Sequence, residues 1–211
     1  MAIPETVTPA PCSLLMLTWN SAPHLRYYAS WYRKYFDDFH ALDRQSTDGT
    51  RELLTELKAT IHEDTFKNFA ERKNYLTNQA RHDWVFHLDS DEAPENSLLN
   101  NLVSWIMDGS KERDPLVIAF KFPRINYEAR DWPDYQVRLY NRRYCEWRNP
   151  VHEIVILKRD GLPVDAERTD SNGHKYKVSH LLQHAIIHDF NWNPKVWAER
   201  QERWKQEQAK G

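Results

Sequence analysis

The spacing of apolar positions predicts strands and helices in alternation over the first half of the chain. Short apolar runs at 13–17 and 84–88 predict buried strands, and residues 38–42 predict a weaker strand between them. Apolar side chains at helical spacing predict helices over residues 23–36 and 68–80. Strands that alternate with helices usually lie parallel in one sheet, so this half predicts an α/β fold.

The same half contains a turn and an acidic cluster. Ser-Thr-Asp-Gly-Thr at 46–50 is a turn signal before a further helix, whose N-cap is expected at Asp48. A short strand is expected near Ile61, and helical spacing resumes over residues 98–107. Ligands of parallel α/β sheets bind beyond the carboxyl ends of the strands. The sequence Asp-Ser-Asp-Glu at 89–92 lies at such an end.

After residue 115 the pattern changes to short strand-like runs. These runs occupy residues 116–122, 135–140, 153–158 and 181–190. Residues 160–178 are polar and rich in turn signals, which predicts a loop. Residues 194–210 are charged and amphipathic, which predicts a terminal helix.

The composition is that of an ordinary globular protein, and its charge balance bears on which classes of partner it can bind. The 211 residues include 29 basic and 31 acidic side chains, a formal net charge of −2. Because no basic excess is present to neutralise a phosphate backbone, we expect no nucleic-acid partner. Nine Trp, ten Tyr and eight Phe suit either sugar and base stacking or a dense core.

Cysteine content and hydropathy bear on the compartment. Cys12 and Cys145 are too few for a disulfide framework, which favours a reducing cytosol. No apolar run approaches the roughly 20 residues that cross a membrane, and residues 1–12 lack the features of a signal peptide. We therefore expect a cytoplasmic protein, with peripheral contact at the cytoplasmic face of a membrane left open.

Glycine is too scarce to build a phosphate-binding loop. The five glycines fit neither G-x-G-x-x-G nor G-x-x-x-x-G-K-[ST]. A nucleotide-binding protein without such a loop needs another positive charge at the phosphates, and a divalent cation is the obvious one. Asp89 and Asp91 are two apart in extended backbone, so their carboxylates can share a Mg²⁺ or Mn²⁺ ion. The alternative for this pair is a solvated acidic turn.

Six segments, in this order, resemble motifs of the family 2 glycosyltransferases of the GT-A fold. They are LLMLTWN (14–20), ALDRQSTDGTRELL (41–54), NFAERKNYL (68–76), DWVFHLDSDEAP (83–94), DYQVRLYNRR (134–143) and NPVHE (149–153). The last two look like the R-L-F-R and V-H-E elements of the subgroup typified by lipopolysaccharide-core β-glucosyltransferases. The resemblance spans residues 13–157, and its motifs are specific as an ordered set.

The resemblance implies a nucleotide-binding parallel or mixed sheet flanked by helices, with a smaller acceptor-side region. It also implies a nucleotide-sugar donor, usually a UDP-sugar, inversion at the anomeric carbon, and a glycan, lipid-linked or protein acceptor. The expected divisions are a tail at 1–12, a nucleotide-sugar-binding half at 13–115, an acceptor-side half at 116–192 and a C-terminal amphipathic helix at 193–211.

Carried over by position, the resemblance assigns roles to six residues. Thr18 and Asn20 would lie at the nucleotide edge, Asp43 at the base or ribose, Lys73 near the diphosphate, Asp89 nearer the ribose, and Asp91 on the metal. Two departures from the family pattern bear on the identity of the donor. Thr-Trp-Asn at 18–20 replaces the usual K-N-E, and Arg44 and Gln45 replace small residues in the turn.

An inverting transfer also needs a base that takes the proton of the acceptor hydroxyl. Asp134 and Glu153 are the candidates. Glu153 follows a candidate metal-site histidine and is expected on the diphosphate side, so Asp134 is preferred. In many enzymes of this fold a later histidine completes the metal sphere, a role open here to His152 or His188.

Three other interpretations stay open. A nucleotidyltransferase also uses carboxylates and Mg²⁺, but it typically needs a Gly-rich phosphate loop. A non-catalytic carbohydrate-binding or assembly protein of the same fold fits the aromatic content and the missing acidic residue after Asn20. His180, His184 and His188 are spaced by four and would share a face, either as zinc ligands of a hydrolase or as core histidines.

Overall fold

The computed structural model describes residues 8–111, 115–126, 134–150, 152–164, 167–169 and 172–188. The first half contains strands β1 (Ala10–Thr18), β2 (Phe36–Asp43), β3 (Thr60–Glu63), β4 (Trp84–Asp89) and β5 (Glu92–Pro94). Its helices are α1 (Ala22–Tyr35), α2 (Thr50–Glu56), α3 (Phe69–Gln79) and α4 (Asn96–Gly109). The second half contains β6 (Leu116–Asn126), β7 (Asp134–Asn141), β8 (Cys145–Arg148), β9 (Ile154–Leu157), β10 (Arg168–Thr169), β11 (Lys175–His180) and β12 (Ile186–His188).

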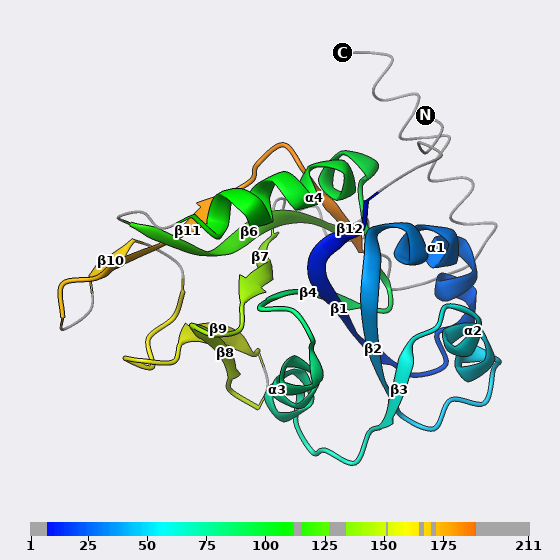
Figure 1. Ribbon diagram of the computed structural model, residues 1–211. Helices are drawn as coiled ribbons and strands as arrows, with labels where there is room; N and C mark the ends of the chain where they lie inside the picture. Colours follow the sequence, from blue (N-terminus) through cyan, green and yellow to red (C-terminus); the bar gives the residue numbers. More distant parts are fainter. Residues whose placement is uncertain are drawn as a thin grey trace.

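One mixed sheet runs through both halves of the chain (Figure 1). Strands β3, β2, β1 and β4 are parallel neighbours, as the alternation of strands and helices predicted. Strand β7 joins antiparallel to β4, and β6 joins antiparallel to β7. Strand β12 lies parallel to β6 and antiparallel to β5, with His188 opposite Glu92. This pairing brings the last described strand beside the acidic turn that follows β4.

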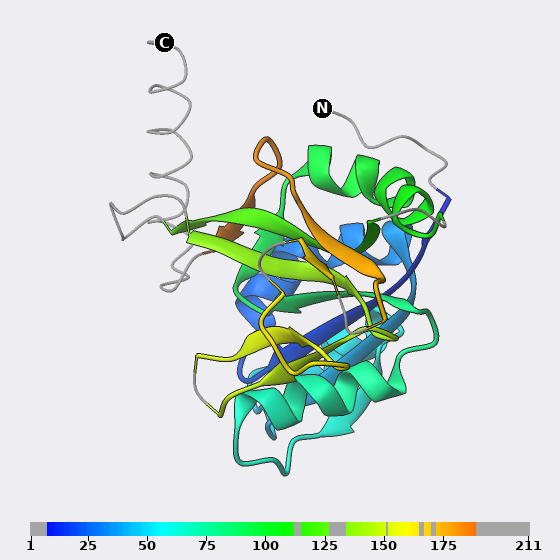
Figure 2. The ribbon, with the colours of Figure 1, turned by 90° about the vertical axis from the view of Figure 1, so that its left-hand side faces the viewer.

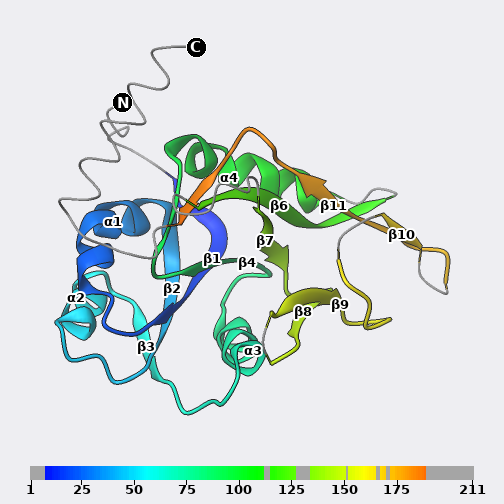
Figure 3. The same cartoon turned by 180° about the vertical axis from the view of Figure 1, so that it is seen from behind.

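Apolar side chains cover both faces of the sheet, so the protein has two hydrophobic layers. Helices α1, α2 and α4 pack on one face, around Leu14, Phe86 and Leu102. Helix α3 and the separate hairpin of β8 and β9 pack on the other, around Leu15 and Tyr140. Figure 2 shows α4 and α3 on opposite sides of the sheet, and Figure 3 shows the hairpin beside α3.

A register shift between β6 and β7 changes the direction of one side chain. Phe120 pairs with Leu139 and Lys121 pairs with Val137, so β7 has one extra residue, Arg138, at this point. A β-bulge of this kind re-aims a side chain that strict alternation would send to the opposite face. Arg138 is 2% exposed and lines the same cavity as Val137.

The second half differs from the prediction more than the first. The expected loop at 160–178 contains β10 and the start of β11, and β5 and β8 were not predicted. These strands are two to six residues long, which is too short for a reliable alternation pattern. The run at 181–190 was expected to be strand-like; of its described residues, 181–188, a strand forms at 186–188, and Leu182 is exposed.

Two expectations about helices have different outcomes. The helix cap expected at Asp48 is wrong, because the N-cap is Gly49, whose φ of 92° is in the left-handed region that favours glycine. The terminal helix expected at 193–211 lies outside the described residues. Among the helices that the structure describes, none is long and apolar enough to cross a membrane.

Candidate active site

The carboxyl ends of β1, β2 and β4 open onto a cavity of about 460 Å³, named here the strand-end cavity. Its own lining includes the polar residues Thr18, Arg44, Asp64, Arg72, Ser90, Asp91 and His188. Ligands of parallel α/β sheets bind at this edge, because the loops that follow the strands meet there. The location predicted from the sequence for the acidic cluster is therefore confirmed.

A second cavity of about 720 Å³ lies between the β6–β7 part of the sheet and the β8–β9 hairpin, and is named here the hairpin cavity. Its own lining includes Lys121, Tyr135, Gln136, Arg138, Trp147 and His152. Phe69, Asp89, Arg124 and Glu153 line both cavities. The two cavities therefore adjoin along a wall made by these four side chains.

Asp43 organises the loop that follows β2. Its carboxylate is fully buried and accepts hydrogen bonds from the Thr18 hydroxyl at 3.0 Å and from the Ser46 backbone N–H at 3.0 Å. The Ser46 hydroxyl donates to it at 2.6 Å, and Arg51 lies 3.2 Å away. Asp43 lines neither cavity, so its contact with a base or ribose stays a prediction.

Asn20 joins this loop to the end of β1. Its backbone N–H donates to the Ser46 hydroxyl at 2.8 Å, and its side-chain carbonyl accepts from the Thr47 N–H at 3.0 Å. A φ of 48° is uncommon for a non-glycine residue, although Asn tolerates it better than most. Asn20 therefore shapes the rim of the strand-end cavity, while Thr18 lies in the cavity lining itself.

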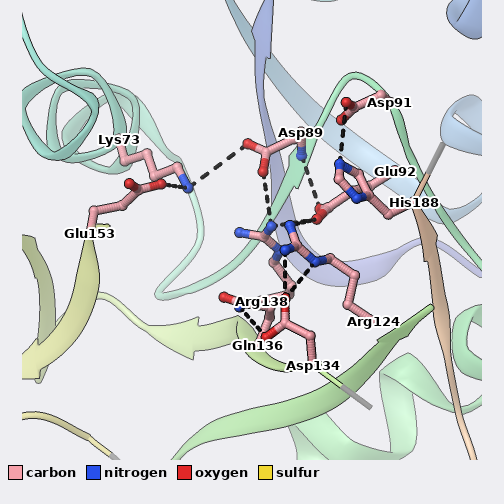
Figure 4. Close-up of polar contacts among 10 residues, drawn as sticks. All are labelled: Lys73, Asp89, Asp91, Glu92, Arg124, Asp134, Gln136, Arg138, Glu153 and His188. Carbon is pink, nitrogen blue, oxygen red and sulfur yellow. Dashed lines mark hydrogen bonds and ion pairs between the residues drawn. The ribbon is translucent and has the colours of Figure 1, made fainter. Parts of the chain in front are cut away.

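Asp89 ends β4 among positive charges. Its Oδ1 atom lies 3.8 Å from Lys73 Nζ, and its Oδ2 atom lies 2.8 Å from Arg138 Nη2 (Figure 4). Burial alone would raise the pKa of Asp89, but the Lys73 and Arg138 charges hold that pKa below its ordinary value. Asp89 is therefore ionised and is held in place by two cations.

Glu92 and Arg138 form a buried ion pair beneath Asp89. Both side chains are 2% exposed or less, and the Arg138 guanidinium donates directly to the Glu92 carboxylate. Arg124 approaches the same carboxylate at 3.4 Å. Burial raises the pKa of Glu92 in spite of these neighbouring guanidinium groups. Neither Glu92 nor Arg138 was predicted as a site residue.

Lys73 is buried to 1% exposure on the inward face of α3. Its ammonium donates to Glu153 at 2.6 Å and lies 4.2 Å from the centre of the Trp147 ring. An ammonium at this depth requires such compensation. Lys73 lies behind the cavity walls and lines neither cavity, so its contact with donor phosphates stays a prediction.

Asp91 and His188 are the best-placed pair for a divalent cation. Asp91 Oδ2 lies 3.3 Å from His188 Nε2, and both residues line the strand-end cavity. Adjacent ligand atoms of an octahedral ion lie about 3 Å apart, since each is about 2.1 Å from Mg²⁺. The pair therefore fits an ion that takes its other ligands from phosphate and water. In the described chain, no three His, Cys, Asp or Glu side chains form a ready-made metal site.

The structure separates the other candidate ligands from this pair. Asp89 is directed to Lys73 and Arg138, so the two carboxylates of the Asp-x-Asp motif have different partners (Figure 4). His152 is exposed and lines the hairpin cavity. The shared face expected for the histidines at 180, 184 and 188 is wrong, because strand β11 ends at the first of them and β12 contains only the last.

The two base candidates lie in different surroundings. The carboxylate of Asp134 is held by Arg124 at 2.5 Å and by Gln136 at 2.8 Å, and it lines neither cavity. Glu153 lines both cavities. The geometry thus favours Glu153, which reverses the preference drawn from the sequence.

Comparisons with known proteins agree with this architecture. No protein-family profile matches the chain. A protein of Rickettsia felis named "uncharacterized glycosyltransferase" is 21% identical over 157 residues, which cover 70% of this chain and 55% of that protein. A Rickettsia bellii protein of the same name is also 21% identical over 157 residues, covering 70% of this chain and 53% of its own length. The chain spans about half the length of these curated relatives.

Two solved structures share the fold at low sequence identity. Staphylococcus aureus TarS aligns with a TM-score of 0.56 and 13% identity, over 84% of this chain and 36% of TarS. Glucosyl-3-phosphoglycerate synthase from Mycobacterium tuberculosis, in complex with Mn²⁺, UDP-glucose and phosphoglyceric acid, aligns at 0.53 and 12% identity, over 89% and 74% of the two chains. The chain therefore has the GT-A fold that the sequence predicted. The narrower likeness to lipopolysaccharide-core enzymes stays a prediction.

Proposed function

We propose that this protein is a glycosyltransferase that binds a nucleotide-sugar in the strand-end cavity and transfers the sugar to an acceptor in the hairpin cavity. The observation that carries the proposal is the Asp91–His188 pair in the strand-end cavity, which shares a wall of side chains with the hairpin cavity. The relatives named glycosyltransferase and the neighbour solved with Mn²⁺ and UDP-glucose support it.

The charges around the site suit a divalent cation such as Mn²⁺ or Mg²⁺. Figure 4 shows five carboxylates, on Asp89, Asp91, Glu92, Asp134 and Glu153, with three basic side chains, on Lys73, Arg124 and Arg138. One divalent cation would neutralise this excess of two negative charges. Asp91 and His188 would hold it, and when bound it would stabilise the negative charge of the departing diphosphate.

The protein's own groups would orient the reactants and move the proton. Glu153 lies on the wall between the cavities, where an acceptor hydroxyl and the donor sugar would meet. We assign it as the base that accepts the hydroxyl proton during an inverting displacement. Lys73 and Arg138 hold the Asp89 carboxylate on the same wall in one orientation. The donor would therefore contact an ionised, oriented carboxylate. A cytoplasmic location and contact with a membrane surface remain part of the proposal.

Calorimetry with UDP and GDP, in Mn²⁺ and then in EDTA, tests the donor half of the proposal. We expect tight binding of one nucleotide that is lost when the metal is removed. Equal affinity with and without metal would exclude the role assigned to Asp91 and His188. Release of UDP or GDP from the corresponding nucleotide-sugars, with and without added glycans, then separates an enzyme from a non-catalytic binding protein of the same fold.

A further inference from the structure

The two cavities differ in the balance of charges on their walls. The strand-end cavity is lined by four carboxylates and three basic side chains, an excess of one negative charge. The hairpin cavity is lined by two carboxylates and three basic side chains, namely Lys121, Arg124 and Arg138, an excess of one positive charge. The hairpin cavity therefore suits an anion, whereas the strand-end cavity suits a cation.

Lys121 carries this positive excess, because the charges of the other two basic residues are matched. Arg138 pairs with Asp89 and Glu92, and Arg124 pairs with Asp134. Throughout the part of the chain that the structure describes, no carboxylate pairs with the Lys121 ammonium. A half-buried ammonium without a counter-ion is costly unless it reaches water or meets an anion.

The position of Lys121 on its strand directs it into the cavity. It is the single charged residue in the run Leu-Val-Ile-Ala-Phe-Lys-Phe at 116–122. Phe120 and Phe122, on either side of it, face α4, where both rings pack against Trp105. Side chains alternate along a strand, so Lys121 faces the other way, beside its cross-strand partner Val137 in the cavity lining. A polar or apolar residue would fill this position without the cost of a half-buried charge.

We propose that the acceptor carries a phosphate or carboxylate group and that Lys121 binds it in the hairpin cavity. A neutral glycan needs hydrogen-bonding groups and aromatic faces, which Gln136, Tyr135 and Trp147 supply. It gives no reason for an unmatched ammonium among them. An anionic group supplies the missing counter-ion and forms a charge-assisted hydrogen bond with it. This inference rests on the proposed function, because it assigns the acceptor to the hairpin cavity.

Ligand-observed NMR titrations with three small sugars test the inference. The probes are glucose 6-phosphate, glucuronate and glucose, each added to the full chain in the presence of Mn²⁺ and whichever of UDP and GDP binds, and again without them. We expect at least one anionic sugar to bind 10-fold or more tightly than glucose, because one charged hydrogen bond contributes on the order of that factor. The anionic sugar should leave the bound nucleotide in place. Comparison of the first two probes distinguishes a phosphate from a carboxylate.

Substitutions at Lys121 then locate the binding. Lys121→Met should reduce the affinity for the anionic probe about 10-fold or more, and Lys121→Arg should retain most of it. The matched control is Lys177→Met, which removes a half-buried lysine from β11, outside both cavities, and should leave the affinity unchanged.

Three results would overturn the inference. These are equal affinity for glucose and both anionic sugars, displacement of the bound nucleotide by the anionic sugar, and equal effects of Lys121→Met and Lys177→Met. Failure of both UDP and GDP to bind would instead refute the proposed function, since nucleotide binding depends on the strand-end cavity.

Discussion

The strand-end cavity and the hairpin cavity share one wall but are built from different parts of the sheet. The strand-end cavity lies where parallel strands end, and two of its four carboxylates, Asp89 and Asp91, come from one short motif at the end of β4. The hairpin cavity lies over antiparallel strands and the β8–β9 hairpin, and its basic residues come from two separate strands. Local sequence thus accounts for half of the acidic residues in the strand-end cavity, whereas the basic residues of the hairpin cavity are brought together by the pairing of β6 with β7.

This difference suggests a division of work between the cavities. The acidic cavity can bind a cation together with a diphosphate, while the basic cavity can bind an anionic partner directly. Asp89, Arg124 and Glu153 stand on the wall between them, so any group that passes from one cavity to the other passes these side chains. Substitutions that affect one cavity and spare the other therefore test the division.

The largest effect is expected from Asp91→Asn, which should abolish the function of the strand-end cavity. Asn keeps the volume of Asp but is a poorer ligand, so the metal's several kcal/mol of stabilisation are lost. We expect a fall in transfer rate on the order of 10⁴ and loss of Mn²⁺-dependent UDP binding in calorimetry. Asp83→Asn, a half-exposed aspartate outside both cavities, is the control. Near-normal turnover in Asp91→Asn would show that Asp91 is not a ligand.

Glu153→Gln tests the shared wall. Removal of a general base costs on the order of 10³ in rate while donor binding persists. Asp134→Asn should cost less than about 10-fold, because Asp134 lines neither cavity. Steady-state kinetics with the identified donor and acceptor, together with melting temperatures, measure both effects. Greater damage from the Asp134 variant would restore the assignment that the sequence favoured.

Arg138→Met should destabilise the protein by about 3 kcal/mol at pH 7, because it leaves Glu92 buried beside Asp89 without its main cation. Arg143→Met, at a largely exposed arginine, should cost under about 0.5 kcal/mol. Urea denaturation measures both free energies of unfolding.

The Arg138→Met deficit should also depend on pH. The lowered pKa of Asp89 gives wild-type protein a stability that is present above the unfolded value of about 3.9 and is lost as pH falls. The raised pKa of Glu92 acts in the opposite sense, and it should rise further without Arg138, so the variant loses stability as pH rises through it. The Asp89 contribution is already complete at pH 5, so the Glu92 change makes the deficit larger at pH 7 than at pH 5. An equal deficit at the two pH values would exclude this electrostatic account.

Lys73→Met is expected to have the smallest effect of the series. Loss of the ammonium leaves Asp89 and Glu153 less compensated, and UDP affinity in Mn²⁺ should fall about 10-fold. Calorimetry and melting temperature, measured on the same samples, separate the two roles proposed for Lys73. A lower melting temperature with unchanged UDP affinity would show that Lys73 only supports the fold.

The sequence predicted the parallel half of the fold and the position of its acidic cluster well. A short apolar run predicted β4, and helical spacing predicted α3. The tendency of ligands to bind beyond the carboxyl ends of parallel strands then located Asp89 and Asp91 at the cavity. Lys73, assigned by the resemblance, is buried on α3, and its contact with donor phosphates stays a prediction. These are local properties, because one strand or one helix suffices to specify them.

Residues whose role depends on pairing between distant strands could not be predicted in the same way. His152 and His188 were equal candidates in sequence, and only the pairing of β12 with β5 selects His188. Glu92 was visible in the acidic cluster, and Arg138 in the Arg-Leu-Tyr sequence of β7. Their ion pair depends on the bulge in β7, for which the sequence carries no glycine or other signal.

That bulge also determines which changes of chain length the site can accept. Side chains along a strand alternate between faces, so deletion of one residue from β7 near Val137 would restore regular pairing with β6. Deletion of Val137 itself would place Arg138 opposite Lys121, so two like charges would lie directly across from each other on neighbouring strands. Insertions and deletions in β7 should therefore be far more damaging than substitutions there. Homologous chains that keep this site should keep the length of β7 even where its residues differ.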